Sequence, residues 1–322
     1  YRPQAVRRVY IPKPGSTKQR PLGIPTYEDK LVQSAVSAIL TEIYETDFCD
    51  FSFGFRPQRG AHDALKLLNA LVMTRKVNYV VDADIRGFFD HVDHAWLMKF
   101  LQHRIADPRL LRLIRRFLKA GIWEQGVETA ATEGTPQGGN LSPLLANVYL
   151  HYALDLWFEK VVQPRSRGAA YLVRYADDFV AGFQYAEDAQ RFYTALGPRL
   201  AKFSLTLAEE KTPMLPFGRF GAHLGRAAGR TKPGTFDFLG FTHFGGRSRL
   251  GRYRLKRRTS RQKFTASMHR VTEWLRTHRT LPIAELMTRL NQKLQGYYHY
   301  YGVTDNRSPA GCVCGRGATR TL

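Results

Sequence analysis

Apolar residues recur with helical spacing in several stretches of the chain, and each stretch predicts an amphipathic helix. The clearest example follows Thr26, which forms a capping-box pattern with Asp29 and precedes apolar positions 32, 36, 39 and 43. The pair Ser142-Pro143 is typical of a helix start, because proline is favoured in the first turn. The pattern also predicts helices over residues 61–75, between 96 and 119, and over 187–203.

Two β-prone stretches contain aspartates inside otherwise apolar runs. Residues 80–85 read Val-Val-Asp-Ala-Asp-Ile and predict a buried strand bounded by Asn78 and Gly87. Residues 171–183 predict two short strands joined by a turn at Ala176-Asp177-Asp178. The first 25 residues predict a basic hairpin around Pro14-Gly15.

The character of the sequence changes after about residue 245. Residues 247–270 contain ten Lys or Arg and no Asp or Glu. Two helices are predicted after this point, over about 259–278 and 282–300, and the last residues read as a tail. We therefore expect three parts, at residues 1–245, 246–303 and 304–322.

Net charge is the compositional feature that bears most on function. The chain has 322 residues and a formal charge of +22, which indicates a polyanionic partner, with nucleic acid favoured over an anionic membrane surface. No apolar run is long enough to span a bilayer, and no secretory leader is recognised. Three cysteines form neither a disulfide framework nor a paired zinc motif, which favours a cytoplasmic protein. Because the chain begins at Tyr1, we expect a fragment of a longer protein.

The aspartates in the two apolar stretches predict a metal site. Side chains alternate along a strand, so Asp82 and Asp84 share one face, and Asp84 can meet Asp177 and Asp178 if the two stretches pair. Clustered carboxylates repel one another unless a cation lies among them, and hard oxygen ligands suit Mg²⁺ or Mn²⁺. Two such ions can activate a hydroxyl and stabilise a leaving group. The alternative is that these aspartates only form turns, and for Asp82 we expect a structural role.

Eight motifs in a fixed order resemble the reverse transcriptases encoded by bacterial group II introns. They span about residues 6–303 and read RRVYIPKPGSTKQRPLGIPT, FSFGFRPQRGAHDAL, YVVDADIRGFFDHVDH, TEGTPQGGNLSPLLANVYL, RYADDFV, LTLAEEKT, FDFLGF and KLQGYYHYYG. The resemblance implies an α+β, right-hand polymerase fold, with fingers and palm in 1–245 and a basic helical thumb, or maturase region, in 246–303. It also implies an RNA-directed DNA polymerase that uses two Mg²⁺ ions, or Mn²⁺, to add dNTPs to a primer. The expected partners are template or intron RNA and primer or target DNA, in intron retrohoming and splicing.

The same resemblance assigns roles to individual residues. Asp84, Asp177 and Asp178 match the catalytic metal ligands, together with the backbone carbonyl of Ile85. Phe89 matches an aromatic gate that excludes a 2′-hydroxyl, although an ordinary core aromatic would fit the pattern as well. The other residues expected at the nucleotide are Lys13, Lys18, Arg20, Gln137 and Lys211. The residues expected at nucleic acid are Arg56, Arg254, Lys256, Arg257, Arg258, Arg261 and Lys263.

Other functions remain open on the sequence. The chain could act as a maturase that binds intron RNA without chemistry, or as a domesticated reverse transcriptase of a defence or CRISPR-linked system. An RNA-dependent RNA polymerase could also use adjacent aspartates, but an aromatic gate at Phe89 argues against ribonucleotide use. We recognise no HNH endonuclease motif and no N-terminal extension of the family type.

Overall fold

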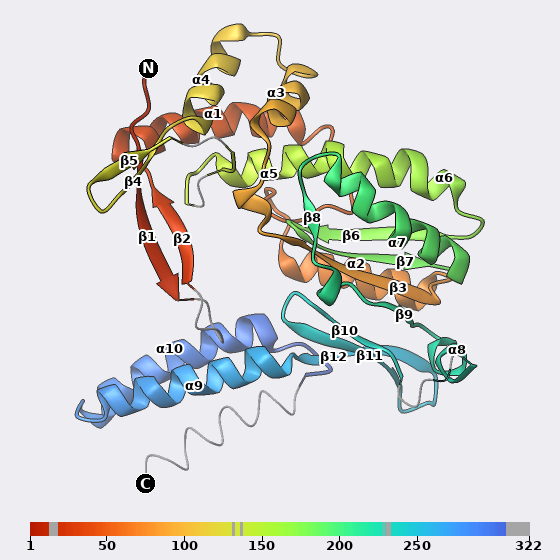
Figure 1. Cartoon of the computed structure of the whole chain (residues 1–322). Helices are drawn as coiled ribbons and strands as arrows, with labels where there is room; N and C mark the ends of the chain where they lie inside the picture. The colour runs from red at the N-terminus through yellow and green to blue at the C-terminus, as the bar shows by residue number, and fades with distance from the viewer. Residues whose placement is uncertain (13–18, 131–132, 136–137, 228, 230–232, 307–322) are drawn as a thin grey trace.

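The computed structural model describes residues 1–12, 19–130, 133–135, 138–227, 229 and 233–306. It contains three separate sheets, with helices packed around the central one (Figure 1). The mixture of helices and antiparallel strands confirms the predicted α+β class. No helix of the described residues is both long enough and apolar enough to cross a membrane.

The N-terminal sheet has the strand order β2-β1-β4-β5 and includes the predicted basic hairpin. Its strands are β1 (Val6–Pro12), β2 (Gln19–Ile24), β4 (Ile122–Glu124) and β5 (Val127–Thr129). Helix α1 (Tyr27–Tyr44) follows the hairpin. The Thr26 hydroxyl oxygen accepts a hydrogen bond from the Asp29 amide and the hydroxyl donates to the Asp29 carboxylate, which confirms the predicted helix start.

The central sheet carries both aspartate-containing stretches. Strand β3 (Tyr79–Arg86) lies in its middle, antiparallel to β7 (Asp178–Phe183), and β7 pairs with β6 (Ala170–Tyr175). The other edge of β3 pairs with β8 (Thr206–Leu207) and β9 (Met214–Pro216). The predicted β6–β7 hairpin is therefore confirmed, and it pairs with the predicted strand.

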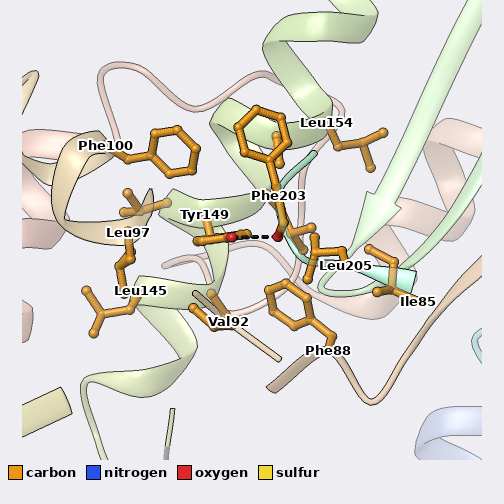
Figure 2. Packing of buried hydrophobic residues seen from close by; sticks show 14 of the residues in the cluster. Ile85, Phe88, Val92, Leu97, Phe100, Leu145, Tyr149, Leu154, Phe203 and Leu205 are labelled. Carbon is orange, nitrogen blue, oxygen red and sulfur yellow. Dashed lines mark hydrogen bonds between the residues drawn. The ribbon is translucent and has the colours of Figure 1, made fainter. Parts of the chain in front are cut away.

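Both faces of the central sheet are buried, against different hydrophobic clusters. Val81, Ala83 and Ile85 belong to the larger cluster with α5 and α7, whereas Val80 packs with α2 in a second cluster. Figure 2 shows part of the larger cluster, where the Tyr149 hydroxyl donates a 2.7 Å hydrogen bond to the Phe203 carbonyl. Alternation along β3 therefore places Asp82 and Asp84 on the face opposite this cluster, as predicted.

Most predicted helices are present with small shifts at their ends. They are α2 (Ala61–Thr74), α3 (His94–Gln102), α4 (Pro108–Leu118), α5 (Ser142–Leu150) and α7 (Ala186–Ala201). Helix α5 continues through the π-helical turns η2 (His151–Asp155) and η3 (Phe158–Val162) into α6 (Gln163–Arg165). Short turns η1 (Phe88–Asp90) and η4 (Glu209–Lys211) follow β3 and β8.

The C-terminal part begins with α8 (Gly221–Ala227) and a three-stranded sheet. Its strands are β10 (Thr235–Phe238), β11 (Phe241–Arg247) and β12 (Tyr253–Thr259). Helices α9 (Arg261–His278) and α10 (Ile283–Tyr301) follow as a pair, as predicted. Strand β12 precedes the two predicted helices and was not predicted, although alternating Tyr253, Leu255 and Thr259 suit a strand with one covered face.

Candidate active site

The pairing of β3 with β7 brings the predicted catalytic aspartates together. Asp84 lies directly opposite Asp178 in the antiparallel register, and Asp177 occupies the β6–β7 turn one residue earlier. Ala176, the other turn residue, has a left-handed backbone with φ of 56°. The turn therefore places Asp177 and Asp178 beside Asp84, on the sheet face that looks toward the β10–β11 turn.

Burial, together with repulsion from neighbouring carboxylates, raises the pKa of Asp82, Asp177 and Asp178. Burial raises the pKa of Asp178 to about 7, and the charges of Asp84 and Asp177 add to the effect, against a stabilising backbone amide from Leu239. The pKa of Asp177 is raised chiefly by burial, and nearby Arg20 partly offsets this. Burial also raises the pKa of Asp82 to about 8, with Asp178 and Asp237 contributing. A cation near Asp84, Asp177 and Asp178 would remove this electrostatic strain.

The donor chemistry of these residues fits a hard divalent cation, but the side chains are not arranged as a finished cage. Within the described residues, no three His, Cys, Asp or Glu side chains lie close enough together to hold a metal ion. Carboxylate oxygens on two adjacent strands are nevertheless the ligand type that Mg²⁺ and Mn²⁺ prefer.

A buried arginine holds the β6–β7 turn through hydrogen bonds. Arg174 is fully buried, and its guanidinium forms a bidentate ion pair with Asp155 at 2.5 and 2.7 Å. It also donates to the Ala176 carbonyl at 3.0 Å, to the Asn147 side-chain oxygen at 3.1 Å and to the Ser52 hydroxyl at 2.7 Å. One side chain thus joins η2, α5 and the loop after α1 to the turn that carries Asp177.

The loop after α1 lies directly against the same turn. A Cβ on Gly54 would lie 2.4 Å from the Ala176 backbone nitrogen, so only glycine fits there. Arg56 was expected at nucleic acid, or as part of the structure of the fingers, and the contacts described for it lie inside the protein. Its side chain is 2% exposed, pairs with Glu45 and donates to the carbonyls of Cys49 and Ser52. All three guanidinium nitrogens thus donate to Glu45 or to carbonyls of the loop.

Only some of the expected nucleotide-binding residues can be placed near one another in the described part of the chain. Phe89 is partly buried and packs edge-on against Phe88 and Phe55, and its carbonyl accepts from the Thr135 amide at 2.8 Å. A cavity of about 370 Å³ lies beside Phe89, lined also by Arg8, Pro21, Gly23 and Thr135 among others. Phe89 is therefore placed at a cavity, as a gate would be, and also packs as a core aromatic would.

The structure describes only some of the remaining residues that were expected at the nucleotide or the metal. Arg20 is exposed on β2 and close enough to lower the pKa of Asp177. Lys13, Lys18 and Gln137 lie outside the described residues, as does the Lys211 side chain, although its backbone belongs to η4 beside β3. Ile85 follows Asp84 in β3, with its side chain in the core.

The expected nucleic-acid cations divide between two faces of β12. Arg254, Lys256 and Arg258 alternate onto one face, whereas the opposite face carries Leu255, which packs in the core, and Arg257. Arg257 is half-buried, and its pKa is lowered by that burial. Arg261 and Lys263 are exposed on the first turns of α9.

Sequence reasoning missed the contact between the C-terminal part and the aspartates. The β10–β11 turn holds Leu239 and Gly240 with positive φ, and the Leu239 amide stabilises the charge of Asp178. The Tyr300 hydroxyl donates to the Leu239 carbonyl at 2.8 Å, so α10 holds this turn. The motifs FDFLGF and KLQGYYHYYG contain these residues, but no spacing in either motif indicates that they meet. Tyr300 and Tyr301 also pack on Phe241.

Comparison with protein families agrees with this geometry. Residues 11–243 match the family described as reverse transcriptase (RNA-dependent DNA polymerase). Residues 264–310 match the group II intron maturase-specific domain, which covers α9 and α10. The chain therefore belongs to the reverse transcriptase family, and its similarity to group II intron proteins is what the motif order predicted.

Individual relatives point the same way. The chain is 51% identical over 151 residues to the group II intron-encoded protein LtrA of Lactococcus lactis, which covers 47% of this chain and 25% of LtrA. It is 38% identical over 208 residues to protein YkfC of Escherichia coli, covering 56% of this chain and 54% of YkfC. The chain thus spans between a quarter and about half the length of these relatives.

Solved structures with the same fold include telomerases. Telomerase from Candida albicans, in complex with a fragment of telomeric RNA, superimposes with a TM-score of 0.60 at 13% identity. The match covers 93% of this chain and 55% of that one. At this identity the comparison supports the polymerase fold alone, and it confirms the predicted fold class.

Proposed function

We propose that this chain is an RNA-directed DNA polymerase of the group II intron type. One observation carries the proposal: Asp84 faces Asp178 across two paired strands, with Asp177 in the adjoining turn, inside a chain of the reverse transcriptase family. Three acids with repulsive, buried surroundings are poorly suited to structure alone and well suited to a divalent cation.

In this proposal Asp84, Asp177 and Asp178, with the Ile85 carbonyl, hold two Mg²⁺ ions, for which Mn²⁺ is the alternative. When bound, such ions lower the pKa of a primer 3′-hydroxyl and stabilise the pyrophosphate leaving group. Leu239 orients Asp178 through its amide. The protein contributes fixed positions for the acids, because Arg174 holds the turn from which two of them extend.

The incoming dNTP would occupy the cavity beside Phe89. Its triphosphate would meet Arg20 and, from the neighbouring hairpin loop, Lys13 and Lys18, whose charges suit phosphate oxygens. The Phe89 ring would lie under the sugar and leave no room for a 2′-hydroxyl. Gln137 and Lys211 complete the proposed nucleotide contacts, at the sugar or phosphate and near the primer.

The nucleic-acid contacts are proposed for the C-terminal part. Arg254, Lys256 and Arg258 form one row on β12, and Arg261 and Lys263 extend it onto α9. Such a row can follow a phosphate backbone carrying template RNA and primer or target DNA. Arg257 would act indirectly, since it is on the other face of β12.

The test is primer extension on poly(rA)/oligo(dT) with dTTP and Mg²⁺, comparing the parent with Asp177→Ala. We expect extension by the parent and none by the variant, because one metal ligand is lost. Glu42→Ala, an exposed acid on α1, is the matched control and should extend normally. Equal extension by the parent and Asp177→Ala would refute the assignment of the catalytic acids.

Support of intron splicing is a second candidate function, favoured by the match of α9 and α10 to the maturase-specific domain. Splicing support needs binding of intron RNA but no polymerase chemistry. Asp177→Ala should therefore retain RNA binding and any splicing activity while losing extension. Loss of RNA binding together with extension in this variant would argue that the two functions are not separable in this way.

A further inference from the structure

Helix α4 presents a continuous row of cations that the polymerase reaction does not use. The exposed residues on it and at its C-cap are Arg109, Arg112, Arg115, Arg116 and Lys119. Between Asp107 and Glu124 the sequence has no acid. The Arg116 side chain donates to the Tyr1 carbonyl at 2.7 Å, whereas the side chains of the other four make no hydrogen bond or ion pair to any described residue.

The opposite side of α4 packs against the protein core. Ile114, Phe117 and Leu118 are buried in the larger cluster, with the remaining leucines of the helix packed against it. A basic amphipathic helix can lie on an anionic membrane only if its apolar face is free to enter the lipid. The apolar face of α4 is not free, so the cationic row is left to bind a polyanion in solution.

A cavity beside the row extends it toward α3. The cavity has a volume of about 540 Å³ and is lined by Lys99, Arg115 and Lys119 together with His94. Two acids, Asp93 and Glu133, also line it, but Asp93 already accepts the Trp96 amide as the N-cap of α3. The Lys99 ammonium lies over the Trp96 ring, 4.6 Å from its centroid. The cavity thus brings several cations together, and one of them also lies over an aromatic ring.

We propose that α4 and the α3–α4 cavity form a second nucleic-acid surface, which binds the phosphate backbone of a structured RNA. Residues three or four apart on a helix have Cβ atoms about 5–6 Å apart, so their cations lie on one side of α4 and can contact successive phosphates of one strand. In Figure 1, α3 and α4 lie at the top of the molecule and α9 and α10 at the bottom, with the catalytic sheet between them. An RNA segment on α4 is therefore separate from the template and primer. The choice of RNA over DNA rests on the proposed function.

The experiment compares the triple variant Arg112→Gln, Arg115→Gln, Lys119→Gln with a control that removes the same charge elsewhere. The control is Arg75→Gln, Lys76→Gln, Arg165→Gln, three exposed cations at the ends of α2 and α6. Binding of a blunt-ended RNA hairpin is measured over a salt series, and extension of poly(rA)/oligo(dT) is measured in parallel.

We expect the α4 variant to lose at least about tenfold in hairpin affinity, and the slope of log affinity against log salt to fall by about 2–3. The control variant should keep both values, and both variants should extend the short primer normally. Equal losses in the two variants, or none, would overturn the proposal. So would binding of anionic phospholipid vesicles that depends on the same residues while hairpin binding does not. Failure of the polymerase assignment would appear only in the extension assay.

Discussion

Removing the charge of Asp155 should destabilise the protein strongly and disturb the catalytic turn at the same time. Arg174 and Asp155 both have fully buried side chains, and their two oxygen–nitrogen contacts are 2.5 and 2.7 Å. Asp155→Asn keeps the shape but leaves the guanidinium charge without its counter-ion. Breaking a buried pair from one side costs about 3–5 kcal/mol, a large part of the roughly 5–15 kcal/mol that stabilises a domain.

The double variant Arg174→Met, Asp155→Leu separates stability from positioning. It removes both charges and leaves apolar groups of similar size, which is often close to neutral for stability. It also removes the donor to the Ala176 carbonyl, whose residue has a left-handed backbone. We therefore expect most of the stability to return in the double variant, while kcat for primer extension stays low and the Mg²⁺ concentration needed for half-maximal rate rises.

Urea unfolding followed by circular dichroism measures the first effect, and extension rates over a Mg²⁺ series measure the second. Glu159→Gln is the matched control, because this acid in η3 pairs only with exposed Lys160. A free energy of unfolding for Asp155→Asn within about 1 kcal/mol of the parent would refute the energetic argument. Full activity in the double variant would refute the role of Arg174 in positioning the turn.

Three further predictions follow from single contacts. Phe89→Ala should lower the preference for dNTPs over ribonucleotides by about 10–200-fold in competitive extension, and an unchanged preference would mean that the ring only packs. Gly138→Ala should lower the melting temperature, because φ is +118° and a Cβ would lie 2.7 Å from the Gly23 carbonyl oxygen; an unchanged value would show that the loop can move aside. His243 has a pKa lowered to about 3 by burial and nearby Arg257, so stability should fall as pH decreases below about 6.5, where the unfolded chain binds the proton first. His243→Phe should flatten that part of the pH–stability curve, and an unchanged curve would assign the acid sensitivity to other groups.

The sequence predicted the elements whose side chains follow a regular period. Alternation around Asp82 and Asp84 identified β3, and the apolar run on both sides of Asp177 identified the β6–β7 hairpin. The pairing of these elements followed from chemistry, since carboxylates gathered for a metal must come from neighbouring strands. That prediction is confirmed by the β3–β7 register.

The errors and omissions concern side chains whose partners are distant in sequence. Arg56 follows a loop motif and has the charge of a phosphate ligand, but Glu45 satisfies it inside the protein. In the sequence, Arg174 resembles any other cation on a strand. Its partner Asp155 lies 19 residues earlier, and only the folded chain brings the two together. The basic residues of 253–259 were noted for their charge, whereas their alternation, which is that of a strand, was overlooked. Charge shows that a partner is needed, and only the fold decides whether that partner is solvent, nucleic acid or another residue.

The hydrogen bond from Tyr300 to Leu239 has a consequence for dividing this chain into modules. The last helix holds the β10–β11 turn, and that turn donates an amide to Asp178. A gene truncated before α10 would therefore encode a protein in which the β10–β11 turn is no longer held and the environment of Asp178 is altered. The truncation would affect the catalytic site as well as removing a helix. A protein with a foreign RNA-binding module in place of α9 and α10 would also lose this support of Asp178, unless the module supplied an equivalent tyrosine. The two matched regions are therefore coupled in this protein, through this hydrogen bond and through the packing of Tyr300 and Tyr301 on Phe241.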